Sequence, residues 1–270
     1  MLYVLYIHVK HGIIINIIGG FFMKKESKIA FTLAEVLITL GIIGVVAAMT
    51  IPSLIQSYKE KATVTAVKQS YSIFAQALKM VAQDYPNLQD LTDSNLSSKE
   101  NSQIMFNEIS KHIKKIKSCD IDNACMPSLY ININDQPTEA WDKAGNIQTG
   151  VLANGTSFWI LNLPQNDIEN STYSGQIGID INGDKKPNKL GVDFFWFTFD
   201  IYGNLYAGIN PHNQATPAGE YNNCELGGSG LNKYNGYGCS EWIITHGNMD
   251  YLKRNVRKNP SKSIKIFMLN

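Results

Sequence analysis

The chain has 270 residues, of which 44% are hydrophobic and 10% aromatic, so its composition is that of a globular protein and excludes a disordered or collagen-like chain. Its formal net charge of +1 hides an uneven distribution: residues 31–250 carry 14 basic and 22 acidic side chains, whereas the last twenty carry six basic and none acidic. An acidic main body argues against nucleic acid as a partner along its length.

Residues 1–22 are apolar but are interrupted by His8, Lys10 and His11, so neither half is long enough to cross a bilayer. Met23 is followed by the basic run KKESK, which indicates the true start of the protein. We therefore expect residues 1–22 to come from an over-extended gene start and not to belong to the fold. The alternative is a second short membrane-associated segment.

The next segment combines a basic lead with a long apolar run. Val36–Ile55 supplies twenty residues without a charge, enough for a helix to cross about 30 Å of hydrocarbon. The lysines before it predict an N-terminus on the cytoplasmic side. Glu35 needs a partner, because a carboxylate at membrane depth costs about 2.5–3.5 kcal/mol. A cut between Ala30 and Phe31 would create an ammonium group on Phe31, one helical turn from Glu35. This ammonium could pair with Glu35 of the same chain or with Glu35 of a neighbouring helix.

The run K-x-x-x-x-A followed by FTLAEV resembles the prepilin leader of type IV pilins and type II secretion pseudopilins. The resemblance implies that a prepilin peptidase cleaves between Ala30 and Phe31 and methylates the new amino group of Phe31. It also implies that Glu35 aligns the subunit with its neighbour in a filament and that Pro52 bends the stem. The family usually has Gly before the cut, and this chain has Ala30.

The resemblance is strong over residues 24–60 and weaker beyond them. It implies a single-pass protein of the inner membrane with its head outside the cytoplasm, which later enters a periplasmic or extracellular filament. The implied partners are the prepilin peptidase, other pilin or pseudopilin subunits, the inner membrane and the assembly platform. The expected divisions are a leader at 1–30 (prepilin leader 23–30), a stem helix at 31–85 with its membrane span at 31–55, a head at 86–250 and a basic tail at 251–270.

Two other readings of the N-terminal segment stay open. An ordinary secretory signal would have its apolar core at Leu33–Val46 and a cut near Ala47–Ala48, although Glu35 fits poorly in such a core. An uncleaved signal anchor would instead carry an exported binding or enzymatic domain.

Beyond the membrane span, apolar residues recur at steps of three and four, which predicts a continuing helix with one face packed on a sheet. They are Val64, Val67, Tyr71, Phe74, Leu78, Val81 and Tyr85. A short coiled-coil seam is the alternative. Pro86 ends the helix.

Residues 86–102 are polar turn formers and indicate a linker, and Met105 begins a short amphipathic helix predicted to end at Lys117. We expect its basic residues to form a solvated face.

After Cys125 the periodicity changes to two. Residues 151–163 predict a hairpin that turns at Asn154-Gly155, and residues 194–202 with 205–209 predict a second hairpin. Ser240–His246 is predicted as a last strand. A helix followed by antiparallel hairpins predicts an α+β fold, pilin-like in its long transmembrane stem packed on a C-terminal antiparallel sheet.

The four cysteines are Cys119, Cys125, Cys224 and Cys239. An exported head would place them where disulfides form. Proximity favours Cys119 with Cys125 and Cys224 with Cys239, but four cysteines allow three pairings. The resemblance adds that pilins commonly close a C-terminal loop with a disulfide. A zinc site is the alternative, although neither pair has the two-residue spacing of a zinc knuckle.

One segment has the pattern of a cation-binding loop. Asp180, Asn182 and Asp184 follow the first, third and fifth ligand positions of a calcium loop, and Asp193 would complete the coordination. The loop departs from an EF-hand, since its glycine comes two positions early and position twelve is not Glu. The pattern is similar to a loop in some pseudopilin-like proteins, and some pseudopilins bind calcium. The alternative is a turn whose acids face solvent.

The sequence contains no motif that is typical of an enzyme active site. There is no G-x-S-x-G elbow and no phosphate-binding loop, and the histidines after residue 31 are isolated. We therefore expect a protein that is not an enzyme and requires no cofactor, with calcium as the one hypothesised ligand.

Overall fold

The computed structural model describes residues 32–93, 95–119, 125–127, 129–138, 146–162, 173–208, 224, 226 and 235–253. The chain divides into two compact units, Met1–Ile51 and Pro52–Asn270. The described helices are α1 (Leu33–Asp84), α2 (Ser98–Lys111) and α3 (Cys239–His246), with short 3-10 helices at Leu88–Leu91 and Asp250–Leu252. The described strands are β1 (Lys115–Cys119), β2 (Gln148–Leu152), β3 (Ser157–Asn162), β4 (Tyr173–Asp180), β5 (Phe194–Asp200) and β6 (Leu205–Ala207).

The first unit contains the N-terminal part of α1. Among the described residues, α1 is the one helix long and apolar enough to cross a bilayer. Its large apolar side chains between Leu33 and Ile55 are exposed on all sides, so nothing in the described chain covers them. This supports the single-pass membrane anchor that the sequence predicts.

In the second unit, α1 continues to Asp84 and buries one face, as the stripe of apolar residues predicts. Val67, Phe74, Leu78 and Val81 are fully buried, and the other stripe residues pack against the same core. This confirms the prediction that one face of the helix packs on a sheet.

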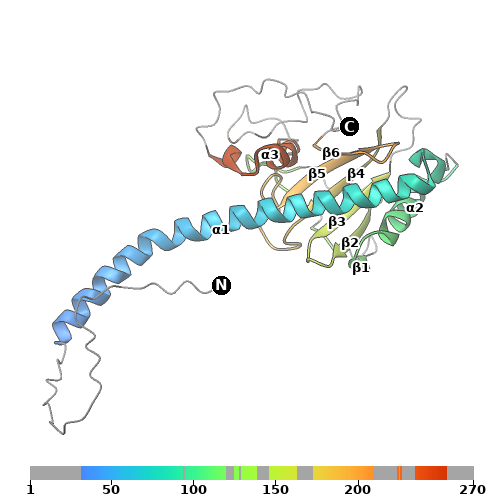
Figure 1. Ribbon diagram of the computed structural model, residues 1–270. Coiled ribbons are helices and arrows are strands. Elements are labelled where there is room, and N and C mark those ends of the chain that lie inside the picture. The colour runs from blue at the N-terminus through green and yellow to red at the C-terminus, as the bar shows by residue number, and fades with distance from the viewer. Residues whose placement is uncertain are drawn as a thin grey trace, which may run out of the picture. The chain divides into compact units, whose positions relative to one another are not determined.

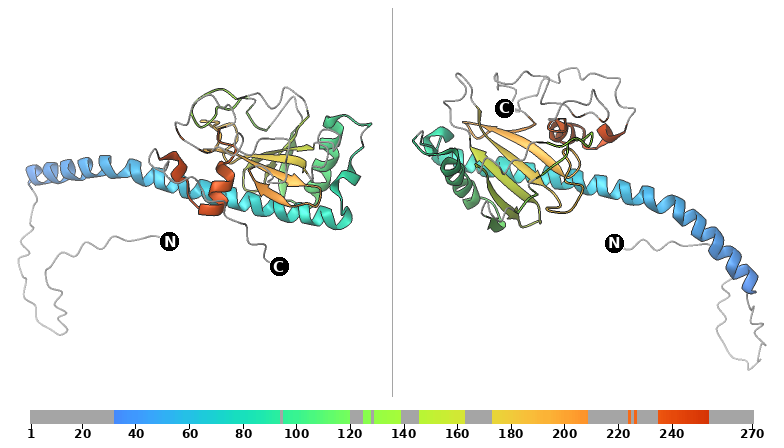
Figure 2. Two further views of the ribbon diagram at one scale, coloured as in Figure 1. Left: turned by 90° about the horizontal axis from the view of Figure 1, so that it is seen from above. Right: turned by 180° about the vertical axis from the view of Figure 1, so that it is seen from behind.

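The sheet has six antiparallel strands in the order β1-β2-β3-β4-β5-β6, so each described strand pairs with its neighbours in sequence. Figure 1 shows α1 crossing this sheet, and the two views of Figure 2 place the second part of α1 along one face of it. The expected α+β layout is thus present in the structure.

Both predicted hairpins are confirmed, and their turns follow from local chemistry. Between β2 and β3, Gly155 takes a positive φ of 88°, and the Asn154 side chain accepts a hydrogen bond from the Thr156 N–H. Between β5 and β6, Gly203 has a φ of 69°, and the buried Asp200 carboxylate accepts bonds from the backbone of this turn. These side-chain bonds fix the register of each hairpin.

The alternation of β5 divides its aromatic residues between two cores. Phe195, Phe197 and Phe199 join the core under α1 and α2, while Phe194 and Trp196 join a second core on the opposite face. Phe158 on β3 links the helices to the first core, since its ring lies 5.1 Å from that of Phe74 and 5.7 Å from that of Phe106. Both faces of the sheet are therefore covered.

The predicted last strand at Ser240–His246 is wrong, because these residues form α3. Cys239, Ser240 and Ile243 are buried at helical spacing, and Gly247 ends the helix in the left-handed conformation with a φ of 70°. A short apolar run does not distinguish a strand from a helix by periodicity.

The segment before β2 also differs from expectation. The predicted linker at 86–102 contains a 3-10 helix and the start of α2, where Ser97 and Glu100 form a capping box. The helix ends at Lys111 instead of Lys117, since the residues after Lys114 pair with β2 as strand β1. Strand β4 was not predicted, because its glycines weaken the strand pattern. Gly178 is needed there because a Cβ would lie 2.3 Å from the Trp159 ring.

Candidate functional site

The first candidate site is the start of α1, where Thr32 and Glu35 form a reciprocal capping pair. The Thr32 N–H and hydroxyl both donate to Glu35 Oε2 at 2.9 Å, and the Glu35 N–H donates to the Thr32 hydroxyl at 3.2 Å. This is the T-x-x-E capping box, a pattern present in the sequence but not used in the prediction. It gives the carboxylate a partner within its own chain.

The capping box leaves part of the Glu35 carboxylate available. Both donated bonds end on Oε2, and no donor within the described residues reaches Oε1. Ala30 and Phe31, the predicted cleavage and methylation residues, lie outside the described residues, so their pairing with Glu35 stays a prediction.

Pro52 lies inside α1, at the boundary between the two compact units. It has no N–H to donate to the carbonyl of Ala48, so the helix loses one backbone hydrogen bond at this point. The predicted bend at Pro52 stays a prediction. A Cβ added at Gly41 or Gly44 would meet no atom within 4 Å, so no contact among the described residues requires a glycine there.

The second candidate site is the loop between β4 and β5. Asp180 is the last residue of β4 and Asp193 directly precedes β5, and their exposed fractions are 0% and 2%. Asp180 accepts hydrogen bonds from the Tyr130 hydroxyl at 2.7 Å and from the Asn182 N–H at 3.0 Å. The structure thus buries the two acids that begin and end the predicted cation loop.

Asp193 holds the middle of this loop by accepting hydrogen bonds from uncharged donors. Its Oδ1 accepts the Lys189 N–H at 2.6 Å, and its Oδ2 accepts the Asn188 N–H at 2.9 Å and the Asn182 side-chain amide at 3.3 Å. Asp184 is exposed, so the predicted ligand set of Asp180, Asn182 and Asp184 is not buried as a unit.

Burial is unfavourable for the charged form of both acids. It raises the pKa of Asp180 to about 7, the charge of Asp193 adds to the rise, and hydrogen bonds from Tyr130 and from the backbone oppose it. Burial likewise raises the pKa of Asp193, and burial beside Asp180 raises the pKa of the Tyr130 hydroxyl. Positive charge would therefore be favourable in this loop.

The four cysteines form the two disulfides that proximity favours. Cys119 is bonded to Cys125 and Cys224 to Cys239, with Cα–Cα distances of 5.8 and 4.9 Å. A zinc site would need free thiolates, so the disulfides replace that alternative.

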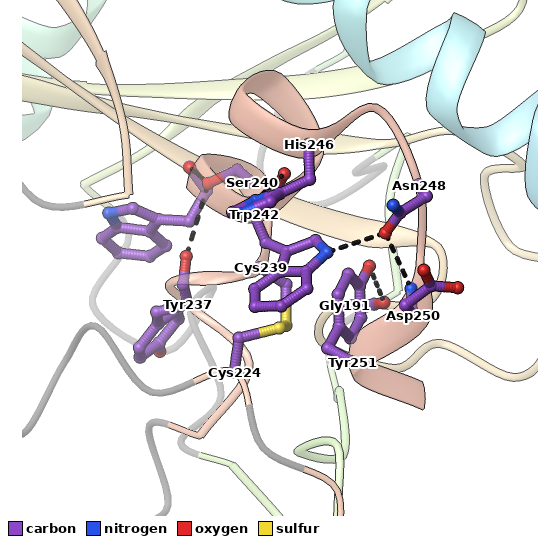
Figure 3. Close-up of a disulfide and its surroundings, with 11 residues drawn as sticks. Gly191, Cys224, Tyr237, Cys239, Ser240, Trp242, His246, Asn248, Asp250 and Tyr251 are labelled. Carbon is purple, nitrogen blue, oxygen red and sulfur yellow. Dashed lines mark hydrogen bonds between the residues drawn. A yellow bond between two sulfur atoms is a disulfide. The ribbon is translucent and has the colours of Figure 1, made fainter. Parts of the chain in front are cut away.

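Figure 3 shows the second disulfide beside α3, with Trp242 and Tyr251 next to it. The Trp242 indole N–H donates to Asn248 Oδ1, and the Tyr251 hydroxyl donates to the carbonyl of Gly191 at 2.8 Å. Gly191 belongs to the β4–β5 loop, and a Cβ there would lie 2.5 Å from Cys239 Sγ. The cation-loop candidate and the second disulfide are therefore packed together.

No protein-family model, no curated protein and no solved structure matches the chain.

Proposed function

We propose that this chain is a structural subunit of a type IV pilus or a type II secretion pseudopilus, a filament protein without enzymatic activity. In this proposal the chain is stored in the inner membrane with its N-terminus in the cytoplasm, cleaved and methylated before Phe31 by a prepilin peptidase, and assembled through α1. The observation that carries the proposal is that one helix is exposed and apolar in its first part and buries one face in the core of the head in its second part.

The apolar part of α1 needs a cover that the described chain does not supply. Leu33, Leu37, Ile43, Met49 and Leu54 are each more than half exposed. Leaving them in water would be unfavourable by about 25 cal/mol per Å² of apolar surface, so lipid or neighbouring helices must surround them. A filament subunit uses lipid before assembly and other stems afterwards.

The capping box supports a role for Glu35 in both states. In the membrane, Thr32 satisfies one carboxylate oxygen within the same chain, which lowers the cost of placing Glu35 near the bilayer. After cleavage, the methylated ammonium of Phe31 on a neighbouring subunit would meet the remaining oxygen. Such a pair sets the axial register of one stem against the next.

A cleavage assay tests the first step of this proposal. On coexpression with an active prepilin peptidase, we expect the chain to shorten by the leader, and we expect Ala30→Gly to be cleaved faster because the family usually has Gly before the cut. Immunoblots over a time course, with an inactive peptidase as the control, measure both rates. If the chain kept its full length with the active enzyme, the proposed cleavage would be refuted and an uncleaved membrane anchor would remain as the interpretation.

A further inference from the structure

We infer that the end of the head where α1 enters it binds an anionic phospholipid surface through Lys59, Lys61 and the basic tail at 251–270. The inference uses the membrane span of α1 but not the assembly of filaments, so it goes beyond the proposed function. The proposed function leaves this tail without a role.

The first step of the argument is the position of this end of the head along α1. The uncharged run ends at Ile55, and Lys59, Glu60 and Lys61 follow shortly after it. At the rise of an α-helix, these charges lie about 6–9 Å beyond the run, and the headgroup layer extends about 5–8 Å beyond the hydrocarbon. Lys59 and Lys61 are exposed, so their ammonium groups can reach lipid phosphates. Tyr58 is exposed beside them, and tyrosine is enriched at membrane interfaces.

The second step is that the chain brings the start of the basic tail to the same place. Tyr251, in the 3-10 helix after α3, is buried in the core against which Val64 of α1 packs. A Cβ added at Gly247, which ends α3, would lie 3.1 Å from Lys68 Nζ. Figure 2 shows this red segment beside α1. The tail therefore leaves the head next to the helix that enters the membrane.

The electrostatics agree with this position. Burial and the negative charge of Glu60 raise the pKa of the Tyr251 hydroxyl. The pKa of the Lys253 ammonium is raised by its hydrogen bond to Asp250, by the charge of Asp250 and by that of Glu60. Glu60 contributes to both shifts, so the start of the tail is close to the residues of α1 that follow the membrane span.

The third step is the chemistry of the tail. Residues 251–270 carry six basic side chains and no acidic one, and a short apolar run follows the last lysine. The basic residues are Lys253, Arg254, Arg257, Lys258, Lys262 and Lys265, and the apolar ones are Ile264, Ile266, Phe267, Met268 and Leu269. Four to eight Lys or Arg next to a membrane span bind anionic lipids, each raising the partitioning by about fivefold. Apolar side chains add to this by entering the boundary between headgroups and acyl chains.

The apolar run favours a lipid surface over an acidic protein surface. Residues 31–250 carry 22 acidic and 14 basic side chains, so the head of a second copy would also attract the tail. That contact would use only the charges, whereas a bilayer takes up both the charges and the apolar residues at 266–269. From Lys253, the residues up to Lys265 can extend about 40 Å, which is several times the distance to the headgroups.

The experiment follows the tail in the full chain reconstituted into vesicles. The four native cysteines form disulfides, so Ser263→Cys introduces one thiol that can carry an environment-sensitive fluorophore. Emission from this label, with quenching from the aqueous side, gives the ratio of lipid-bound to free tails. The vesicles contain phosphatidylcholine alone or with about 30 mol% phosphatidylglycerol. We expect the ratio to be at least about tenfold higher with phosphatidylglycerol and to fall in about 1 M salt, which screens the charges.

Two pairs of substitutions separate the tail from the net charge. Lys262→Gln with Lys265→Gln removes two charges of the tail and should lower the ratio by about tenfold or more. Lys185→Gln with Lys186→Gln is the matched control, because it makes the same change at exposed positions of the β4–β5 loop, and it should leave the ratio unchanged. Phe267→Ser tests the apolar contact and should lower the ratio severalfold.

Three results would overturn the inference. The first is equal exposure of the label in both kinds of vesicle. The second is an equal loss in the tail pair and in its matched control. The third is a signal that depends on the protein-to-lipid ratio but not on phosphatidylglycerol, which would assign the tail to the acidic head of a second copy. None of these results bears on cleavage before Phe31, so the inference can fail while the proposed function stands.

Discussion

Replacing Phe74 with Ala is expected to lower the free energy of unfolding of the head by about 3–5 kcal/mol. Phe74 is fully buried on α1, and its ring meets Phe158 of β3 edge to face. The substitution removes the largest fully buried side chain of α1 and leaves a cavity that the surrounding rings cannot fill. Urea denaturation of the full chain in detergent, followed by circular dichroism, measures the loss.

Met80→Ala on the same helix is the matched control. Met80 is 42% exposed, so its truncation should change the free energy of unfolding by no more than about 0.5 kcal/mol. Equal effects of the two substitutions would mean that the second part of α1 does not form the core of the head.

Glu35→Ala is expected to reduce incorporation into filaments by at least about tenfold while membrane insertion continues. The expected loss follows from removing one partner of the proposed charge pair between subunits, which costs about 2–5 kcal/mol when such a pair is buried. Insertion should not suffer, because an uncharged residue enters the bilayer more easily. The amount of the chain in sheared filaments, relative to the membrane fraction, measures incorporation.

Glu35→Gln separates the charge from the helix cap. A glutamine at this position can keep the capping box with Thr32, but it cannot pair with an ammonium. We expect it to fail in assembly as Glu35→Ala does. Normal incorporation of Glu35→Gln would assign Glu35 to helix capping alone and refute its role between subunits.

The parts of the fold that the sequence predicts are those with strong local signals. The stripe through Val67, Phe74 and Leu78 has a helical period, because one face of the helix is buried in the core and the opposite face is in solvent. Asn154-Gly155 specifies its turn because the two residues tolerate the required backbone angles. By contrast, β4 has glycines where a strand pattern expects large residues, because the Trp159 ring occupies the space beside Gly178 and the Phe199 ring occupies the space beside Gly175. That reason is visible only in the folded chain.

The candidate sites divide in the same way. The capping partner of Glu35 was readable as T-x-x-E, since the pattern is local. The pattern of the cation loop was readable in the sequence, but the burial of its acids was not: Asp180 and Asp193 are buried, whereas Asp184 is exposed. Their burial depends on Tyr130 and the second disulfide, which lie far from the loop in sequence.

The measurement that tests the central claim most directly is the mass of the N-terminal peptide of the chain in filaments sheared from cells. The account predicts N-methylated Phe31 as the first residue. An intact start, or a first residue near Met49, would contradict it, because the chain would then be an uncleaved anchor or a secreted protein.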